Sequence, residues 1–433
     1  MSRVVINAVP FRTHLKEGAQ RLLAHDKARA AKFLQGLHPH GPVGSVAATN
    51  SNHPHHHHHH HRKPRHAHEG GAAATAPSTT EPAPVPPAGD PQAASDSIDV
   101  TDAGVTYTTS VGVGSPATQY TLLIDTAECF HSWVGAGTKY KQTKTSKSTR
   151  NTVNVTYGSG SFSGTEFTDQ VTLGTGLVIE NQSIGVASKA SGFSDVDGIL
   201  GIGPVDLTEG TVSNTTTVPT VTDNLFAQGT IPQESIGISY EPTTSEGSVN
   251  GELTFGGVDD TKISGDVTFV PITSTSPASN YWGIDQTVSY GNSSRPILQS
   301  AGIVDTGTTL LLLATDAFQA YQKATGAKLD QTTGLLTVTE QQFEKLESLF
   351  FNIGGTTFEF TPNAQIWPRS QNAVLGGEEG KIYLITADLG SNSGSGLDFI
   401  NGFVWLQRFY SVFDTTNTQV GIANTPFTDA ETN

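Results

Sequence analysis

Cysteine and histidine are nearly absent from most of this chain of 433 residues. The sequence holds 1 Cys and 15 His, and fourteen of the His lie between His14 and His68. Beyond residue 68 only Cys129 and His131 remain. A single cysteine cannot form an internal disulfide. With one His and one Cys beyond residue 68, Ser-His triads, Cys-His pairs and zinc sites made of thiolate or imidazole ligands are disfavoured. Carboxylates are therefore the side chains left for acid and base chemistry.

Long apolar runs are missing as well. No segment has the length needed to span a membrane, and residues 1–18 contain no apolar run typical of a signal peptide. We therefore expect no membrane anchor. Four Asn-x-Ser/Thr sequons are compatible with secretion, at Asn154, Asn181, Asn214 and Asn292.

Positive charge is scarce in the larger part of the chain. Residues 1–95 hold 10 Lys/Arg and 5 Asp/Glu, a net charge of +5, whereas residues 96–433 hold 14 and 35, a net charge of -21. An acidic body of this kind repels the phosphates of nucleic acid, so we expect no nucleic-acid partner. The basic opening stretch instead suggests an intramolecular partner.

The composition favours a β-rich body. The chain holds 46 Gly, and from about residue 98 onward short apolar runs alternate with Gly, Ser, Asn and Thr turns, as in "VTYTTSVGVG" (105–114), "QYTLLID" (119–125) and "FYSVFD" (409–414). This alternation predicts an all-β fold with many short strands. Helical patches are expected at residues 315–325 and 339–350.

The opening stretch has a different character. Apolar positions at three- and four-residue steps predict an amphipathic helix within residues 9–37. Residues 38–95 contain the His tract "HPHHHHHHHRKPRHAH" and an Ala/Pro-rich segment, which predict a disordered linker. The His tract is interpreted as a solvated spacer, with metal binding, pH sensing and an artificial origin as alternatives.

A weak internal duplication marks two halves of the body. "LLIDTA" (122–127) and "GIVDTG" (302–307) place Asp-Thr after aliphatic residues, with Asp125 and Asp305 separated by 180 positions. Each is followed later by an apolar run broken by Gly, "DGILGIGP" (197–204) and "DFINGFVWLQRFY" (398–410). Two copies of one unit predict two facing lobes, residues 96–270 and 271–433, after a leader of residues 1–95.

If the lobes pair about a two-fold axis, Asp125 and Asp305 meet. Two carboxyl groups about 3 Å apart do not both ionise easily, so they share one proton. The protonated member can protonate a substrate carbonyl while the ionised member takes a proton from a water molecule. A single Asp-Thr-Gly is most often a turn, but two copies at half-chain separation favour a catalytic pair.

The chain resembles the pepsin-like aspartic endopeptidases, especially the fungal, disulfide-free polyporopepsin-type group. The motifs that carry the resemblance are "IVDTGTTLLLL" (303–313), "VTYGSGSFSGTEFTDQVTLG" (155–174), "SDVDGILGIGP" (194–204) and "GFVWLQRFYSVFDTTNTQVGIA" (402–423), within residues 98–427. The resemblance implies a bilobal pepsin-like fold, two β lobes related by a pseudo-two-fold axis with a cleft between them. It also implies endopeptidase activity at acid pH on protein or peptide substrates.

The resemblance assigns roles to individual residues. Asp125 and Asp305 are the implied catalytic aspartates, supported by Thr126, Thr306, Gly307 and Thr308 in the two catalytic loops. Tyr157, Gly158 and Ser159 are implied in a flap that closes over substrate. Trp133 is implied as a neighbour whose indole N–H meets the Tyr157 hydroxyl. No metal and no cofactor are expected.

The resemblance also explains the leader as an inhibitory propeptide of a zymogen. Its basic residues are expected to pair with carboxylates at neutral pH and to release when acid protonates them, although ordinary solvated charge is an alternative. Lys27 and Lys32 are the candidates for a cation over the two aspartates. The resemblance further implies a monomer in an extracellular or vacuolar location, matured near residues 92–98.

One stretch departs from the family. "IDTAECFHSWVGA" (124–136) has one additional residue between Asp125 and Trp133 relative to the family pattern Asp-Thr-Gly-Ser-Ser-Asn-Thr-Trp. Ala127 places a methyl group in a tight loop, at a cost of about 1 kcal/mol if the backbone there is unusual. Glu128 replaces a hydroxyl donor with a third carboxylate, which raises the pKa values of its neighbours.

Three explanations of this stretch stay open: a wrongly assigned splice junction, a copy that has lost catalysis, and an active variant with rebuilt contacts. The leading function is an aspartic-type endopeptidase. The alternative is a catalytically impaired or inactive pepsin-like protein that binds peptides. A carbohydrate-binding β protein is a remoter alternative, because no sugar-site constellation is present.

Overall fold

Strands account for more of the described body than helices do, as the composition predicts. The structure, a computed structural model, describes residues 18–36, 96–102, 107–127, 132–157, 160–193, 196–245 and 248–432. The predicted linker, with its His tract, lies outside these residues, as do residues 128–131 of the altered loop and residues 158–159 of the predicted flap.

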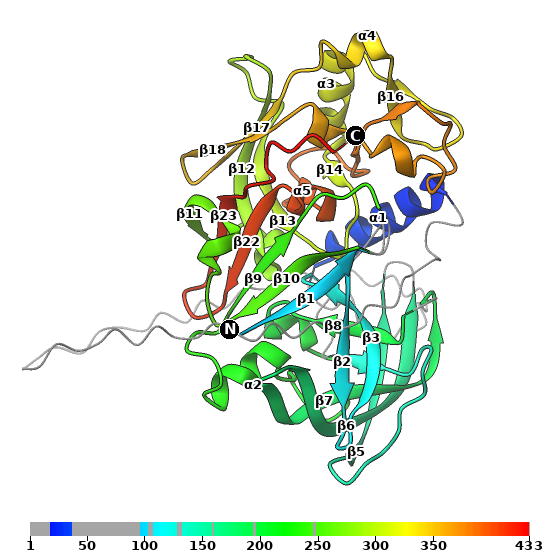
Figure 1. Ribbon diagram of the computed structural model, residues 1–433, viewed down its shortest axis with the longest axis vertical. Helices are drawn as coiled ribbons and strands as arrows, with labels where there is room; N and C mark the ends of the chain where they lie inside the picture. The colour runs from blue at the N-terminus through cyan, green and yellow to red at the C-terminus, as the bar shows by residue number, and fades with distance from the viewer. Residues whose placement is uncertain are drawn as a thin grey trace, which may run out of the picture. The chain divides into compact units, whose positions relative to one another are not determined.

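In the described part of the chain, the larger sheet has thirteen strands. Figure 1 shows three of them, β9, β10 and β1, side by side. The order of all thirteen across the sheet is β11-β23-β22-β9-β10-β1-β2-β3-β8-β4-β7-β6-β5. Their bounds are β1 Asp96–Asp102, β2 Tyr107–Val113, β3 Thr118–Asp125, β4 Trp133–Val134, β5 Lys147–Thr156, β6 Ser161–Gly174, β7 Leu177–Ser191, β8 Gly198–Gly201, β9 Ser235–Tyr240, β10 Val249–Phe255, β11 Ser264–Pro271, β22 Phe409–Asp414 and β23 Gln419–Asn424.

Two further sheets come from the second half of the chain. Among the described residues, one has seven strands in the order β18-β17-β12-β13-β21-β14-β20, and the other has three in the order β15-β16-β19. Their bounds are β12 Gly283–Tyr290, β13 Leu298–Val304, β14 Leu311–Leu313, β15 Lys328–Leu329, β16 Leu336–Val338, β17 Leu349–Ile353, β18 Thr356–Phe360, β19 Ile382–Tyr383, β20 Thr386–Asp388 and β21 Phe399–Asn401. The larger sheet also takes in β22 and β23 from the C-terminal end, and the division near residue 270 stays a prediction.

Helices are short. They are α1 Ala19–Phe33, α2 Val221–Ala227, α3 Thr315–Thr325, α4 Glu340–Phe343 and α5 Phe403–Leu406. The expected helices at residues 9–37 and 315–325 are confirmed where the structure describes them. The helix expected over 339–350 is wrong in extent, because Leu349, Phe351 and Ile353 alternate inward and form strand β17 against β12.

The internal duplication is a repeated strand arrangement. Strand β3 pairs in parallel with β8, and β8 pairs antiparallel with β4. In the second half β13 pairs in parallel with β21, and β21 pairs antiparallel with β14. The two Gly-interrupted runs therefore lie beside the two Asp-Thr strands.

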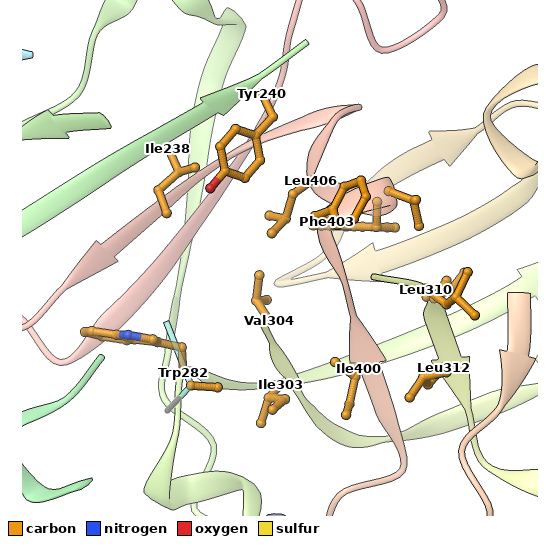
Figure 2. Close-up of a cluster of buried hydrophobic side chains, with 14 of the residues drawn as sticks. Ile238, Tyr240, Trp282, Ile303, Val304, Leu310, Leu312, Ile400, Phe403 and Leu406 are labelled. Carbon is orange, nitrogen blue, oxygen red and sulfur yellow. The ribbon is translucent and has the colours of Figure 1, made fainter. Parts of the chain in front are cut away.

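A continuous apolar core supports the ends of these strands. Figure 2 shows part of it, with Ile303 and Val304 of β13 among Ile400, Leu310 and Leu312. Ile124, Ile303 and Val304 are each fully buried and come directly before the aspartates. Burying a side chain of this size contributes about 1.5–3 kcal/mol, so the chain is firmly held up to the point where each carboxylate begins.

Candidate active site

The two predicted aspartates end the duplicated strands and are both buried. Asp125 is the last residue of β3 and Asp305 directly follows β13, with exposed fractions of 1% and 0%. Their backbones are held by the parallel neighbours, because Ile202 N donates to Asp125 O at 2.9 Å and Asp305 N donates to Asn401 O at 3.1 Å. Both carboxylates therefore leave their strands from fixed positions.

Two threonines join the two loops. Thr126 N donates to Thr306 Oγ1 at 3.1 Å, and Thr306 N donates to Thr126 Oγ1 at 2.9 Å. The Thr306 hydroxyl also donates to Ile124 O at 3.1 Å. These reciprocal bonds hold the residues after Asp125 and Asp305 next to each other, although they are far apart in the sequence.

Each carboxylate accepts a backbone N–H from the residue two positions later. Ala127 N donates to Asp125 Oδ1 at 3.0 Å, and Gly307 N donates to Asp305 Oδ1 at 2.9 Å. Asp305 accepts one further bond, from Thr308 Oγ1 to Oδ2 at 2.6 Å. Hydrogen bonds to an ionised carboxylate favour its charged form.

The close approach of the loops is clear at Gly307. A Cβ built on Gly307 meets Asp125 Oδ2 at 2.5 Å and also collides with the Arg29 guanidinium.

Ala127 carries its methyl group in a fully buried place, and its backbone is not among those with positive φ. The strain expected at Ala127 is therefore absent, because the condition of an unusual backbone is not met.

A single arginine from the leader helix binds both carboxylates. Arg29 Nη2 donates to Asp125 Oδ1 at 2.6 Å and to Asp305 Oδ1 at 3.0 Å, and Arg29 Nε donates to Asp305 Oδ2 at 2.8 Å. The guanidinium is a planar fork that matches two carboxylate oxygens at once. Arg29 is 4% exposed, so these charged bonds are shielded from solvent.

The expectation of Lys27 or Lys32 over the aspartates is wrong. Lys27 Nζ lies 3.9 Å from Asp388 Oδ2, and Lys32 Nζ lies 5.5 Å from the centre of the Tyr157 ring. The register of α1 against the body decides which side chain points at the carboxylates. No periodicity within the helix sequence reveals that register.

Asp26 forms a second attachment of the leader that the sequence analysis missed. Its fully buried carboxylate accepts from Thr309 N at 3.2 Å and from Leu310 N at 2.9 Å, in the loop that follows Asp305. His25 Nδ1 lies 3.2 Å from Asp26 Oδ1. Positions 26 and 29 share one helix face, and this spacing is the signal that could have indicated a paired contact.

Apolar leader side chains complete the contact. Phe33 is buried and its ring centre lies 4.9 Å from that of Tyr281. At the beginning of the helix, Ala19 N donates to Leu375 O at 2.8 Å. The described part of the leader therefore has polar contacts at both aspartates and apolar contacts beside them.

The predicted flap residues are partly described. Tyr157 follows β5, is 6% exposed, and its ring centre lies 5.1 Å from that of Phe193. Trp133 is fully buried and stacks on Phe162 with ring centres 4.2 Å apart. Within the part of the chain that the structure describes, Trp133 Nε1 has no hydrogen-bond partner, so the expected bond to the Tyr157 hydroxyl is not formed.

The other predicted site residues fall into those that the structure brings together and those that it does not describe. Asp125, Thr126, Asp305, Thr306, Gly307 and Thr308 are brought together, whereas Gly158 and Ser159 lie outside the described residues. Across the described ranges no group of three or more His, Cys, Asp or Glu side chains is placed to hold a metal ion. No helix in those ranges is long and apolar enough to cross a membrane.

Comparisons with known proteins agree with this geometry. Residues 106–425 match the family model described as eukaryotic aspartyl protease. The chain is 60% identical over 342 residues to polyporopepsin from Irpex lacteus, covering 78% of this chain and 100% of that protein. It is 32% identical over 304 residues to rhizopuspepsin from Rhizopus chinensis, covering 66% of this chain and 74% of that protein.

A solved structure is similar over the same span. The crystal structure of the aspartic proteinase from Irpex lacteus superposes with a TM-score of 0.76 at 61% sequence identity. The match covers 78% of this chain and 100% of that one.

Proposed function

The chain belongs to the eukaryotic aspartyl protease family, and on this premise we propose that Asp125 and Asp305 are its catalytic pair. Pepsin-like aspartic endopeptidases hydrolyse peptide bonds in protein substrates. The observation that carries the assignment is that one guanidinium binds both buried carboxylates, whose loops are joined by Thr126 and Thr306. No other pair of carboxylates in the described residues is held in this way.

The proposed reaction needs only these two carboxyl groups and water. One ionised carboxylate removes a proton from a water molecule, whose oxygen attacks the carbonyl carbon of the peptide bond. The other carboxyl group, still protonated, donates its proton to the carbonyl oxygen. The first carboxyl group then donates the proton taken from water to the leaving nitrogen as the carbon–nitrogen bond breaks. The second carboxylate takes a proton back from a hydroxyl group of the tetrahedral intermediate, so the pair returns to its starting charge.

The supporting residues act by position. Thr308 and the N–H groups of Ala127 and Gly307 hold the carboxylates in orientation. Tyr157, together with Gly158 and Ser159, is proposed to cover the bound peptide, and Trp133 packs beneath through Phe162. Both aspartates come from one chain, so the site is proposed to work in a monomer.

The leader is proposed to keep the enzyme inactive until acidification. Arg29 occupies both aspartates, so water and substrate cannot reach them while α1 is docked. Arginine stays charged at every relevant pH, whereas acid protonates carboxylates of the body and so weakens its attraction for the basic leader. The net charges of +5 and -21 on the leader and the body add a long-range attraction that acid also weakens.

This chemistry suits an acidic place outside the cytosol, and we propose an extracellular or vacuolar location. The proposal rests on the acid-dependent release of the leader and on the relationship to polyporopepsin. Detection of the protein in culture fluid or vacuolar fractions tests it.

The experiment that tests the function is proteolysis by the purified full chain before and after acidification to about pH 4, near the usual aspartate range. We expect cleavage of a denatured protein substrate after acidification, inhibited by pepstatin. Asp305→Asn should remove it, with a loss of about 10²-fold or more. A wild-type chain that binds peptides but cleaves none would instead establish the inactive alternative.

The leader is tested separately with Arg29→Gln. We expect this variant to cleave substrate without prior acidification, whereas Lys27→Gln should remain as latent as the unaltered chain. Equal latency of the two variants would contradict the role of Arg29 and leave the catalytic assignment untouched.

A further inference from the structure

A basic surface stands out on the acidic body. Five of its 14 Lys/Arg fall within residues 139–150, and no Asp or Glu occurs between Glu128 and Glu166. We call this cluster the basic loop surface; its members are Lys139, Lys141, Lys144, Lys147 and Arg150. The five cations carry +5, and the three carboxylates bonded to the same segment, Asp169, Asp197 and Glu166, reduce the local net charge to +2, which is still opposite in sign to the net charge of -21 of the body.

All five cationic side chains are exposed. None of them forms an ion pair with a carboxylate of the described ranges, and the one interaction of their charged groups is Lys139 Nζ donating to Gly135 O at 2.9 Å. An exposed ion pair contributes little to stability, so these cations lose little by having no carboxylate partner among the described residues. These cations face solvent instead, and are available to a partner.

The loop under the surface is firmly held. Asp169 is fully buried and accepts bonds from Tyr140 Oη at 2.5 Å, Thr145 Oγ1 at 2.6 Å and Ser146 Oγ at 2.7 Å. Asp197 accepts from Thr138 N at 2.6 Å. The lysines are therefore presented on a preorganised loop, which lowers the entropy lost when a partner binds.

The side chains between the cations restrict the partner. The only aromatic residue, Tyr140, is partly buried and bonded to Asp169, so no exposed ring is available to stack on a base or to enter a membrane. Gln142 and Ser148 are exposed and supply an amide and a hydroxyl group, whereas the Thr149 hydroxyl donates to Glu166 Oε2 at 2.8 Å. Cations alternating with such groups match a polymer that carries both anions and hydroxyl groups.

We propose that the basic loop surface binds a linear acidic polysaccharide. Carboxylates of the polymer pair with the lysines, and its hydroxyl groups bond to the side chains between them. The rest of the body repels a polyanion, so the polymer binds at this surface and the interaction weakens with salt. Binding leaves the proteolytic reaction unchanged and brings the enzyme onto an acidic matrix.

The test is the affinity of the full chain for sodium polygalacturonate, measured by retention on the immobilised polymer at low salt and about pH 8, where the fourteen His of the leader are neutral and the leader stays docked. The patch variant combines Lys139→Gln, Lys141→Gln, Lys144→Gln and Lys147→Gln. The control variant removes the same charge elsewhere, through Arg295→Gln, Lys323→Gln, Lys328→Gln and Lys345→Gln, all exposed. We expect at least a tenfold loss of affinity for the patch variant and less than a twofold change for the control.

Several results overturn the proposal. They are an unchanged affinity in the patch variant, an equal loss in both variants, and binding that does not weaken with salt. Equal affinity for duplex DNA or for anionic lipid vesicles overturns the assignment to polysaccharide. If the quadruple variant does not fold, Lys144→Glu carries the same test with an expected loss of about threefold. Activity on a soluble peptide is measured in parallel and is expected to stay unchanged.

Discussion

The two aspartate loops share a backbone hydrogen bond to the carboxylate, and they differ in the side chain that stands three residues after the aspartate. Asp125 and Asp305 each accept the N–H two residues on, at 3.0 and 2.9 Å, although one donor is an alanine and the other a glycine. Only Asp305 accepts a described hydroxyl, that of Thr308. At the corresponding place after Asp125 the sequence has Glu128, which lies outside the described residues. A backbone bond survives changes of side chain, but a hydroxyl donor does not.

The leader is attached to both loops among the described residues. Arg29 donates to Asp125 and to Asp305, and Asp26 accepts two N–H groups from the loop after Asp305. The loop after Asp305 therefore offers the leader a second attachment beyond the aspartate itself.

Residues 127 and 307 hold the same position in the two loops, and exchanging alanine and glycine there is expected to give the largest difference in kcat/KM. Gly307→Ala places a carbon 2.5 Å from Asp125 Oδ2, so one carboxylate must move. We expect kcat/KM of the acid-activated protein to fall by about 100-fold, because displacements near 1 Å have this effect on catalysis. Ala127→Gly should lower it by at most about threefold. Equal effects at both positions would contradict the asymmetry.

The hydroxyl difference should be the next largest. Thr308→Val removes the 2.6 Å bond to Asp305 while keeping the shape of the side chain. A hydrogen bond to a charged group contributes about 1.5–3 kcal/mol, so we expect kcat/KM to fall at least tenfold. The measurement is peptide hydrolysis across the acid range.

The opposite substitution adds a hydroxyl group to the loop after Asp125. Glu128→Thr supplies a hydroxyl at the position that the family fills with a donor, and removes a third carboxylate from the sequence next to Asp125. We expect kcat/KM to rise. A fall would indicate that Glu128 has taken a role of its own.

A smaller effect is expected at the leader's second attachment. Asp26→Asn keeps the size of the side chain and removes the charge that accepts from Thr309 and Leu310. The leader should release at a higher pH than in the unaltered chain, but less readily than in Arg29→Gln. Stopped-flow or gel analysis of activation at stepped pH values measures the order, and release no earlier than in Lys27→Gln would contradict it.

Glu234 and Asp223 form a second carboxyl pair, with no arginine of the described ranges between them. The smallest predicted effect is that of this pair on the pH dependence of stability. A side-chain hydrogen bond with Asp223, together with burial, raises the pKa of Glu234 to about 8 from its usual 4.5. The folded protein keeps this proton up to about pH 8 while the unfolded chain loses it near pH 4.5, so stability falls as pH rises between these values. The aspartate pair has Arg29 between its members, whereas this pair relies on the shared proton.

Glu234→Gln tests the contrast. The variant should have the same melting temperature as the unaltered chain near pH 4 and a higher one near pH 8, by a few degrees at most because the group is partly exposed. Glu379→Gln, at an exposed position, serves as the control. Parallel melting curves at both pH values would rule out Glu234 as a source of pH sensitivity.

Much of the site could be predicted because it follows from local pattern and repetition. Asp125 and Asp305 stand after apolar runs, and a repeated motif implies a repeated strand pairing. The capping box at Thr220 and Asp223, which begins α2, is also a local signal within the sequence. The helix expected across 339–350 failed because Leu349 and Phe351 pack as strand residues against β12, a contact that is not local.

The sequence by itself determined the chemistry available to this protein, since it leaves carboxylates as the acid and base groups, repeats Asp-Thr at half-chain distance and separates a basic leader from an acidic body. Only the tertiary structure decided that Arg29 is the residue that binds both aspartates and that Asp26 is attached beside it. The physical reason is that periodicity defines the faces of a helix, whereas the rotation and height at which the helix docks depend on the surface it meets.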